Sequence, residues 1–235
     1  MKLLVNPSPE KWKKQLARPV QKTKEINKIV KPIFEKVEKN GDKALKKFAQ
    51  EYDHVSLDSL LVTPEEIKAA KDQISKELKE AIKTAKANIE RFHAAQATPE
   101  LIEEVMPGVV CRRKSVPIQR VGLYIPGGTA PLFSTVLMLG VPAKIAGCKE
   151  VVLCTPPNRE GKIHPAILYT ADLVGITKIV KVGGAQAVAA LTFGTESVPQ
   201  VDKIFGPGNQ YVTAAKQFAT KYGVAIDMPA GPSEV

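Results

Sequence analysis

The stretch VGLYIPGGTAPLFSTVLMLG, residues 121–140, joins a strand, a glycine turn and a helix. Its apolar start is typical of a buried strand. The chain then breaks at Pro126-Gly127-Gly128 and resumes with small and apolar residues. Glycine lets the backbone approach a ligand closely, and the free N–H groups at a helix start attract anions. The stretch matches neither the G-x-G-x-x-G fingerprint nor a P-loop, so its ligand has to be inferred from the rest of the chain.

The same strand-then-helix pattern continues to residue 228. Strands are predicted at residues 121–125, 150–154, 177–182, 201–205 and 224–228, and helices at residues 131–146, 164–175, 185–194 and 211–223. Such alternation implies right-handed crossovers and a parallel sheet that is covered on both faces. The predicted fold class is therefore α/β, a doubly wound Rossmann-like parallel sheet preceded by a mainly helical N-terminal region.

The N-terminal region, residues 1–118, is expected to be mainly helical with a short extended connector, and residues 119–235 to form the Rossmann-like domain. A first helix follows from apolar residues at helical spacing through residues 26–37. Pro32 should kink this helix or mark its start. Asn40-Gly41 should end it, and Asp42 can cap the next helix.

A second long helix is predicted for residues 63–96. Thr63 and Glu66 form a capping box at its start, and Pro64 occupies the first helical position. Residues 101–120 contain short extended runs and prolines, which indicate a connector resembling a β-hairpin. His54 and His93 are interpreted as surface or packing residues of this region.

The composition narrows the class of protein. The net charge is +10, but the lysines are spread along helices that also carry glutamate, so we expect no nucleic-acid partner. No apolar run approaches the 18 residues of a membrane span, and no signal peptide is recognised, so we expect no membrane association and a cytoplasmic location. The three cysteines include Cys148 and Cys154, which we interpret as packing residues near a strand rather than zinc ligands.

Candidate binding residues lie at the turns after the strands, where open α/β sheets bind ligands. They are Tyr124, Gln186, Asn209 and Ser233, each within or beside a turn rich in glycine or proline. The same turns contain no histidine and no pair of carboxylates. His164 is interpreted as a helix cap or a solvent-facing residue. The residues alone thus predict a nucleotide-binding domain, with no catalytic acid, base or metal ligand assigned.

At these turns the sequence resembles the histidinol dehydrogenase family. The matching runs are YIPGGTAPLFSTVLMLGVPAKIAGC, VGGAQAVAALTFGTESVPQVDKIFGPGNQYVTAAK and AIDMPAGPSEV. The resemblance implies a homodimeric, zinc-dependent enzyme that oxidises L-histidinol to L-histidine with two NAD in sequence. It implies NAD contacts at Tyr124, Gln186 and Asn209, with Tyr124 offering a hydroxyl and a flat face, and a substrate contact at Ser233. The glycine turn at residues 126–129 would shape a wall beside the cofactor.

The resemblance also implies what this sequence lacks. In the family, the zinc ligands and a Glu-His pair that performs acid/base catalysis follow the PAGPSEV run. The chain is therefore expected to be an N-terminal portion that is inactive alone, with no catalytic or metal residue of its own. Two alternatives stay open: a related zinc- and NAD-dependent dehydrogenase of another small alcohol such as sulfopropanediol, and a non-catalytic binding or assembly module.

Overall fold

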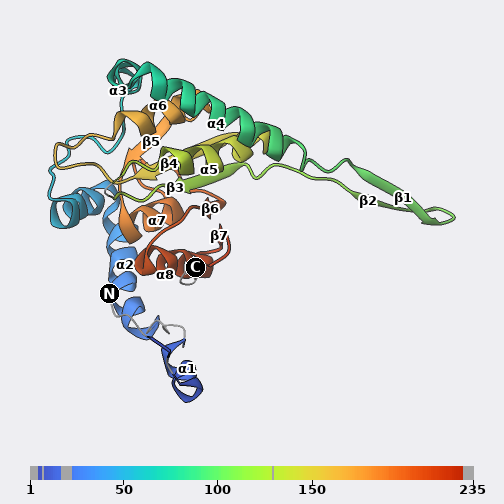
Figure 1. Ribbon diagram of the computed structural model, residues 1–235, viewed down its shortest axis with the longest axis horizontal. Helices are drawn as coiled ribbons and strands as arrows, with labels where there is room; N and C mark the ends of the chain where they lie inside the picture. The colour runs from blue at the N-terminus through green and yellow to red at the C-terminus, as the bar shows by residue number, and fades with distance from the viewer. Residues whose placement is uncertain (1–4, 7, 17–22, 129, 230–235) are drawn as a thin grey trace.

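A computed structural model describes residues 5–6, 8–16, 23–128 and 130–229, and Figure 1 shows its course. The N-terminal elements are α1 (Pro9–Gln15), α2 (Thr23–Phe48), the π-helix η1 (Ala49–Asp53), α3 (Pro64–Ala70), the 3-10 helix η2 (Lys71–Gln73), α4 (Lys76–Ala94), β1 (Leu101–Met106) and β2 (Val109–Arg113). They are followed by β3 (Arg120–Tyr124), α5 (Phe133–Ala146), β4 (Glu150–Thr155), α6 (Pro165–Leu173), β5 (Lys178–Lys181), α7 (Gly184–Phe193), β6 (Lys203–Phe205), α8 (Gln210–Ala219), the 3-10 helix η3 (Thr220–Tyr222) and β7 (Ala225–Ile226).

The main sheet confirms the predicted fold class. Its five strands are parallel and lie in the order β5-β4-β3-β6-β7. The first strand of the domain, β3, is central, and the chain builds outward from it first on one side and then on the other. All nine predicted elements of residues 121–228 are present within a few residues of their expected bounds.

Two hydrophobic cores cover the two faces of this sheet. Along β4, Val152 and Cys154 point into one core and Leu153 into the other, as the alternation of a strand requires. The first core is shared by α2, α7 and α8, and the second by α3, α4, α5 and α6. Figure 1 shows these two helical layers on either side of the sheet. Helices from residues 1–118 therefore complete both faces; the boundary near residue 119 stays a prediction.

Helix α2 differs from its prediction at Pro32. The helix begins nine residues earlier, at Thr23, so Pro32 lies inside it and is not its start. The non-helical residue within α2 is Gly41, with φ 48° and ψ −131°, which confirms the predicted stop at Asn40-Gly41. Beyond it, the carboxylate of Asp42 accepts hydrogen bonds from Thr195 and Ser197, which follow α7. Asp42 therefore links distant segments instead of capping its own helix.

The prediction of one helix over residues 63–96 was wrong. The chain leaves the helical conformation at Ile74 (φ −121°, ψ 148°), and Ser75 begins α4 by accepting a hydrogen bond from the N–H of Leu78. The predicted capping box at Thr63 and Glu66 is confirmed. Periodicity concealed the break because the apolar stripe continues across it, whereas the serine that caps α4 was visible in the sequence.

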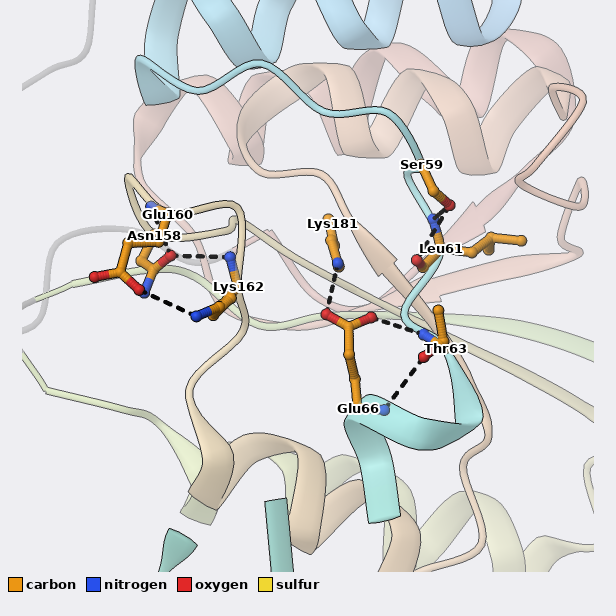
Figure 2. Close-up of polar contacts among 8 residues, drawn as sticks. All are labelled: Ser59, Leu61, Thr63, Glu66, Asn158, Glu160, Lys162 and Lys181. Atoms are coloured by element: carbon orange, nitrogen blue, oxygen red, sulfur yellow. Dashed lines mark hydrogen bonds and ion pairs between the residues drawn. The ribbon is translucent and has the colours of Figure 1, made fainter. Parts of the chain in front are cut away.

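The segment before α3 is attached to the edge of the sheet. The N–H of Lys181 donates to the Leu60 carbonyl at 2.7 Å, and the N–H of Val62 donates to Ile179 at 3.0 Å. Figure 2 shows Glu66 between two partners: its Oε1 lies 2.7 Å from Lys181 Nζ, and its Oε2 accepts from the Thr63 N–H at 2.8 Å. One carboxylate thus completes the start of α3 and pairs with the buried lysine of β5.

The predicted connector is confirmed as an antiparallel hairpin of β1 and β2. It projects away from the body of the molecule (Figure 1), and every residue of both strands is exposed. Neither core cluster includes a residue of this hairpin. Its apolar side chains Leu101, Ile102, Val105, Met106, Val109 and Val110 are between 44% and 60% exposed.

The structure also tests the predictions for the two cysteines and for a membrane span. Cys154 is buried in β4, and Cys148 is half-buried just before that strand, which confirms both as packing residues. Among the helices in the described ranges, none combines the length and apolar character needed to cross a membrane.

Candidate functional site

The candidate site lies where the strand order reverses. β3 and β6 are hydrogen-bonded neighbours, but the connections that leave them run to opposite sides of the sheet. Such a reversal opens a crevice beyond the carboxyl ends of the two strands. Here Tyr124 ends β3, and the turn Gly206-Pro207-Gly208-Asn209 follows β6.

A cavity of about 360 Å³ lies at this edge of the sheet. It brings together Gln186 and Asn209, two of the residues predicted to contact a cofactor. Gly184 and Gln186 bring the first turn of α7 to the cavity, and Asn209 the start of α8. The complete lining is Ile29, Ile33, Tyr52, Asp53, Gly184, Ala185, Gln186, Asn209 and Tyr211. Segments from Ile29 to Tyr211 therefore form one pocket that combines polar groups, two helix N-termini and apolar side chains.

Gln186 is the most distinctive polar group of this cavity. The residue is 4% exposed, and its side-chain amide, which is open to the cavity, has no hydrogen-bond partner among the described residues. An amide that is open to a cavity and unpaired within the protein is available to a ligand or to water. An amide both donates and accepts, which suits ribose hydroxyls, carboxamides and phosphates alike.

Asn209 has a structural task besides any contact with a ligand. Its Oδ1 accepts hydrogen bonds from the N–H groups of Tyr211 (3.0 Å) and Val212 (3.1 Å), so Asn209 is the N-cap of α8. With the oxygen occupied in this way, the Nδ2 group is the part of the side chain that can donate to a molecule in the cavity.

Tyr124 does not line the cavity, but it contacts Gly184, which does. Its ring is 3% exposed, and its hydroxyl oxygen accepts a hydrogen bond from the N–H of Gly184 at 3.0 Å. Gly183, the N-cap of α7, has no side chain that could accept a hydrogen bond. The hydroxyl of Tyr124 on β3 therefore accepts from a free N–H at the start of that helix. Burial raises the pKa of Tyr124 to about 12, although the bond from Gly184 acts in the opposite direction.

A buried ion pair holds the turn that carries Asn209. Lys216, 4% exposed on α8, donates through Nζ to the Gly206 carbonyl at 2.7 Å and pairs with Asp227. Asp227 in turn accepts from the Gly206 N–H at 2.8 Å. Gly206 has φ 137°, and a Cβ there would overlap the Tyr124 carbonyl, so the position requires glycine. Lys216 was not identified from the sequence, because a lysine on a helix is usually solvated.

Asp53 and Tyr52 were also missed by the sequence analysis. They lie at the end of η1, and single turns of π-helix are frequent at functional sites. Burial raises the pKa of the Asp53 carboxyl, with a smaller opposite effect from His54. No periodicity or turn motif marks these residues; only the packing of α2 against α7 and α8 brings them to the cavity.

The glycine turn at the start of α5 faces a different cavity. Pro126, Gly127 and Gly128 line a space of about 440 Å³ on the side of α5 and α6, together with Asn158, Lys162 and His164. Thr129 lies outside the described residues. His164 Nδ1 accepts from the Ala166 N–H at 3.2 Å, which confirms the predicted helix cap. The turn thus borders a second cavity on the opposite side of β3 from Gln186 and Asn209.

The described residues offer neither a metal site nor the predicted substrate contact. Within the described ranges, no group of three His, Cys, Asp or Glu side chains is placed to hold a metal ion. Ser233, the predicted substrate contact, lies outside the described residues, as does Glu234. The site residues therefore stay predictions, with Gln186 and Asn209 gathered in one cavity and Tyr124 in contact with Gly184 of its lining.

Comparisons with known proteins agree with the resemblance of the turns. A family model described as Histidinol dehydrogenase matches residues 16–235. The chain is 59% identical over 235 residues to a histidinol dehydrogenase of Bacteroides thetaiotaomicron, covering all of this chain and 55% of the relative. A crystal structure of histidinol dehydrogenase from Elizabethkingia anophelis superposes with a TM-score of 0.91 at 55% identity, covering 97% of this chain and 53% of that one.

A further relative is a histidine biosynthesis trifunctional protein of Kluyveromyces lactis, 52% identical over 227 residues. The match covers 94% of this chain and 29% of that larger protein. The chain spans about 55% of the length of the Bacteroides relative.

Proposed function

Because the chain belongs to the histidinol dehydrogenase family, we propose that it supplies the NAD-binding part of an enzyme that oxidises L-histidinol to L-histidine. The observation that carries this proposal is the cavity at the strand reversal, where Gln186 and Asn209 lie together at two helix N-termini. Both the neutral amides and the positive ends of the helices suit a dinucleotide, whose phosphates are anionic.

Each part of the site has a separate role in this proposal. NAD would supply the oxidant: one molecule would take a hydride from the alcohol carbon, and a second would take a hydride from the aldehyde carbon after water has added to it. Gln186 and the Nδ2 group of Asn209 hydrogen-bond the dinucleotide and fix its position. Tyr124 keeps the first turn of α7 in place, and Lys216 with Asp227 keeps the turn of Asn209 in place. Ser233 remains the predicted contact to the substrate.

Zinc belongs to the proposal only through the family. The described residues contain no cluster that fits a metal ion, so none of them is assigned to zinc and no step is derived through it. We likewise propose a homodimer and a cytoplasmic location only because they are expected for the family. Among the alternatives, the matches to histidinol dehydrogenases favour histidinol over other small alcohols.

The first test is binding of NAD by the 235-residue chain, measured by isothermal titration calorimetry. Replacing Gln186 with alanine should weaken binding by about 1–2 kcal/mol, the usual scale for one hydrogen bond in a site. Gln217→Ala is the matched control, because Gln217 is exposed on α8 and lies outside the cavity. Equal affinity of both variants and the parent chain would contradict the assignment of the cavity.

The second test concerns the substrate. Deleting the gene that encodes this chain should make the host require histidine, and supplying L-histidine, but not L-histidinol, should restore growth. Growth of the deletion strain without histidine would favour another small alcohol. Rescue by L-histidinol would place the missing step earlier and would also contradict the proposal.

A further inference from the structure

An unpaired carboxylate lies in the same cavity as the two amides. Asp53 ends η1 and lines the cavity together with Gln186 and Asn209. The side chain is half-buried and has no hydrogen-bond or ion-pair partner among the described residues. Partial burial disfavours the charged carboxylate and raises its pKa, so a ligand that donates hydrogen bonds to Asp53 would stabilise the charged form.

The surroundings of Asp53 indicate which ligand group would meet it. Ile29, Ile33 and Ala185 give the cavity an apolar wall, and Tyr52 adds an aromatic ring. An adenine ring suits such a wall, and the ribose attached to it presents two neighbouring hydroxyls. A carboxylate has two oxygens and can accept from both hydroxyls at once.

The usual source of such a carboxylate is missing here. In common dinucleotide folds an acidic residue about 20 residues after the first glycine turn binds the ribose, close to the end of the second strand. In this chain the second strand of the sheet is β4, and residues 156–158, which follow it directly, are Pro, Pro and Asn. Asp53 brings a carboxylate to the sheet edge from the N-terminal region instead.

The charge balance of the cavity favours an unphosphorylated ribose. NADP carries an additional phosphate on the 2′-hydroxyl of the adenosine ribose, and this dianion would face the Asp53 carboxylate directly. No lysine or arginine is among the described residues that line the cavity, so the repulsion would not be offset.

We propose that Asp53 accepts hydrogen bonds from the adenosine ribose hydroxyls and thereby selects NAD over NADP. This inference rests on the proposed function, since it assumes that the cavity binds the dinucleotide. Asp53 is then a specificity-determining residue supplied by the helical region rather than by the Rossmann-like strands.

The test compares NAD and NADP binding by the 235-residue chain, its Asp53→Asn variant and a Glu51→Gln control. Glu51 lies in the same π-helix and loses the same charge, but it is exposed and outside the cavity; it interacts with Tyr52, which both dinucleotides would contact, so its loss can change both affinities but not their ratio. The parent chain should bind NAD at least tenfold more tightly than NADP, and Asp53→Asn should reduce that ratio by about tenfold or more. Glu51→Gln should keep the ratio of the parent chain. Asp53→Ser serves the same purpose if the asparagine variant does not fold, as judged by thermal melting.

Two smaller probes identify the ribose. Both probes contain only the adenosine half of the dinucleotide. Asp53→Asn should weaken binding of 5′-AMP, whose ribose hydroxyls lose the carboxylate as acceptor. It should strengthen binding of 2′,5′-ADP, whose 2′-phosphate no longer faces a negative charge. Three outcomes would overturn the inference. The ratio of NAD to NADP affinity could stay unchanged in the Asp53 variants, or it could change equally in Glu51→Gln. The parent chain could also bind NAD and NADP equally well. If Gln186→Ala still weakens NAD binding in these cases, the proposed function stands; if the parent chain binds no NAD, both fall.

Discussion

At the scale of single residues, Asn209 begins α8 and also lines the candidate cofactor cavity. Asn209→Ala should therefore lose about 1 kcal/mol of stability with the cap and, in addition, weaken NAD binding. Asn209→Asp keeps the capping oxygen but loses the amide donor, so it should retain stability and still bind NAD more weakly. Urea unfolding together with calorimetric titration separates the two effects. If Asn209→Asp binds NAD as tightly as the parent chain does, the amide of Asn209 does not contact the cofactor and the prediction is wrong.

Tyr124 gives a prediction at high pH. The phenol has a pKa of about 12 in the folded protein, against about 10 in an unfolded chain, because burial disfavours the phenolate. Between these values the folded state binds more protons than the unfolded state. The stability that Tyr124 contributes is thus complete below pH 10 and is lost as the pH rises towards 12.

The measurement is a spectrophotometric titration at 295 nm of the folded chain and of Tyr124→Phe. The difference between the two should show one tyrosine that ionises near pH 12. The same difference measured in guanidinium chloride is the control and should show ionisation near pH 10. If the tyrosine that Tyr124→Phe removes ionises near pH 10 in the folded chain, the ring is not buried as described.

At the scale of secondary-structure elements, α8 and the turn before it are joined by Lys216. Lys216→Met should leave the Gly206 carbonyl and Asp227 without their buried partner and cost about 2 kcal/mol or more of unfolding free energy. NAD binding should also weaken several-fold, because the turn that positions Asn209 loses its anchor. Urea unfolding and NAD titration are the two measurements.

Arg120→Met is the matched control for this variant. Arg120, at the start of β3, and Asp202, just before β6, form a half-exposed pair 2.7 Å apart at the opposite edge of the sheet. Its loss should cost less than about 1 kcal/mol and leave NAD binding unchanged. Equal losses of NAD affinity in both variants would mean that general loosening, rather than the anchored turn, is responsible.

The regular elements of the sheet could be predicted from the sequence, whereas the break within the predicted helix of residues 63–96 could not. Strands such as β4 are short apolar runs bounded by turn residues, and their local signal is strong. The break at Ile74 was missed because an apolar stripe continues through it. Gln186 and Asn209 could be placed because they follow strand ends. The position of Asp53 at the cavity and the contact of Lys216 with Gly206 could not be predicted, since both depend on contacts between distant segments.

At the scale of the whole molecule, α2, α3, α4 and the sheet form one body with the hairpin outside it. Replacing residues 101–113 with a short Gly-Ser link should change the unfolding free energy by less than about 1 kcal/mol, because none of these residues belongs to a core. The ends of the hairpin can be joined because Leu101 pairs with Arg113. Ile82→Ala in α4, where the side chain is fully buried, should cost about 2–5 kcal/mol in the same urea experiment. A hairpin deletion as costly as Ile82→Ala would show that the ribbon supports the body.

The packing of α2 against the far end of the chain also governs how the protein emerges from the ribosome. Phe34 rests edge-on against Phe193 and Phe218, which are synthesised roughly 160–185 residues later. At about 5–20 residues per second, the apolar stripe of α2 waits on the order of ten to forty seconds for its partners. During that interval the apolar face of α2 lacks the partners that cover it in the folded protein, until α7 and α8 have left the exit tunnel.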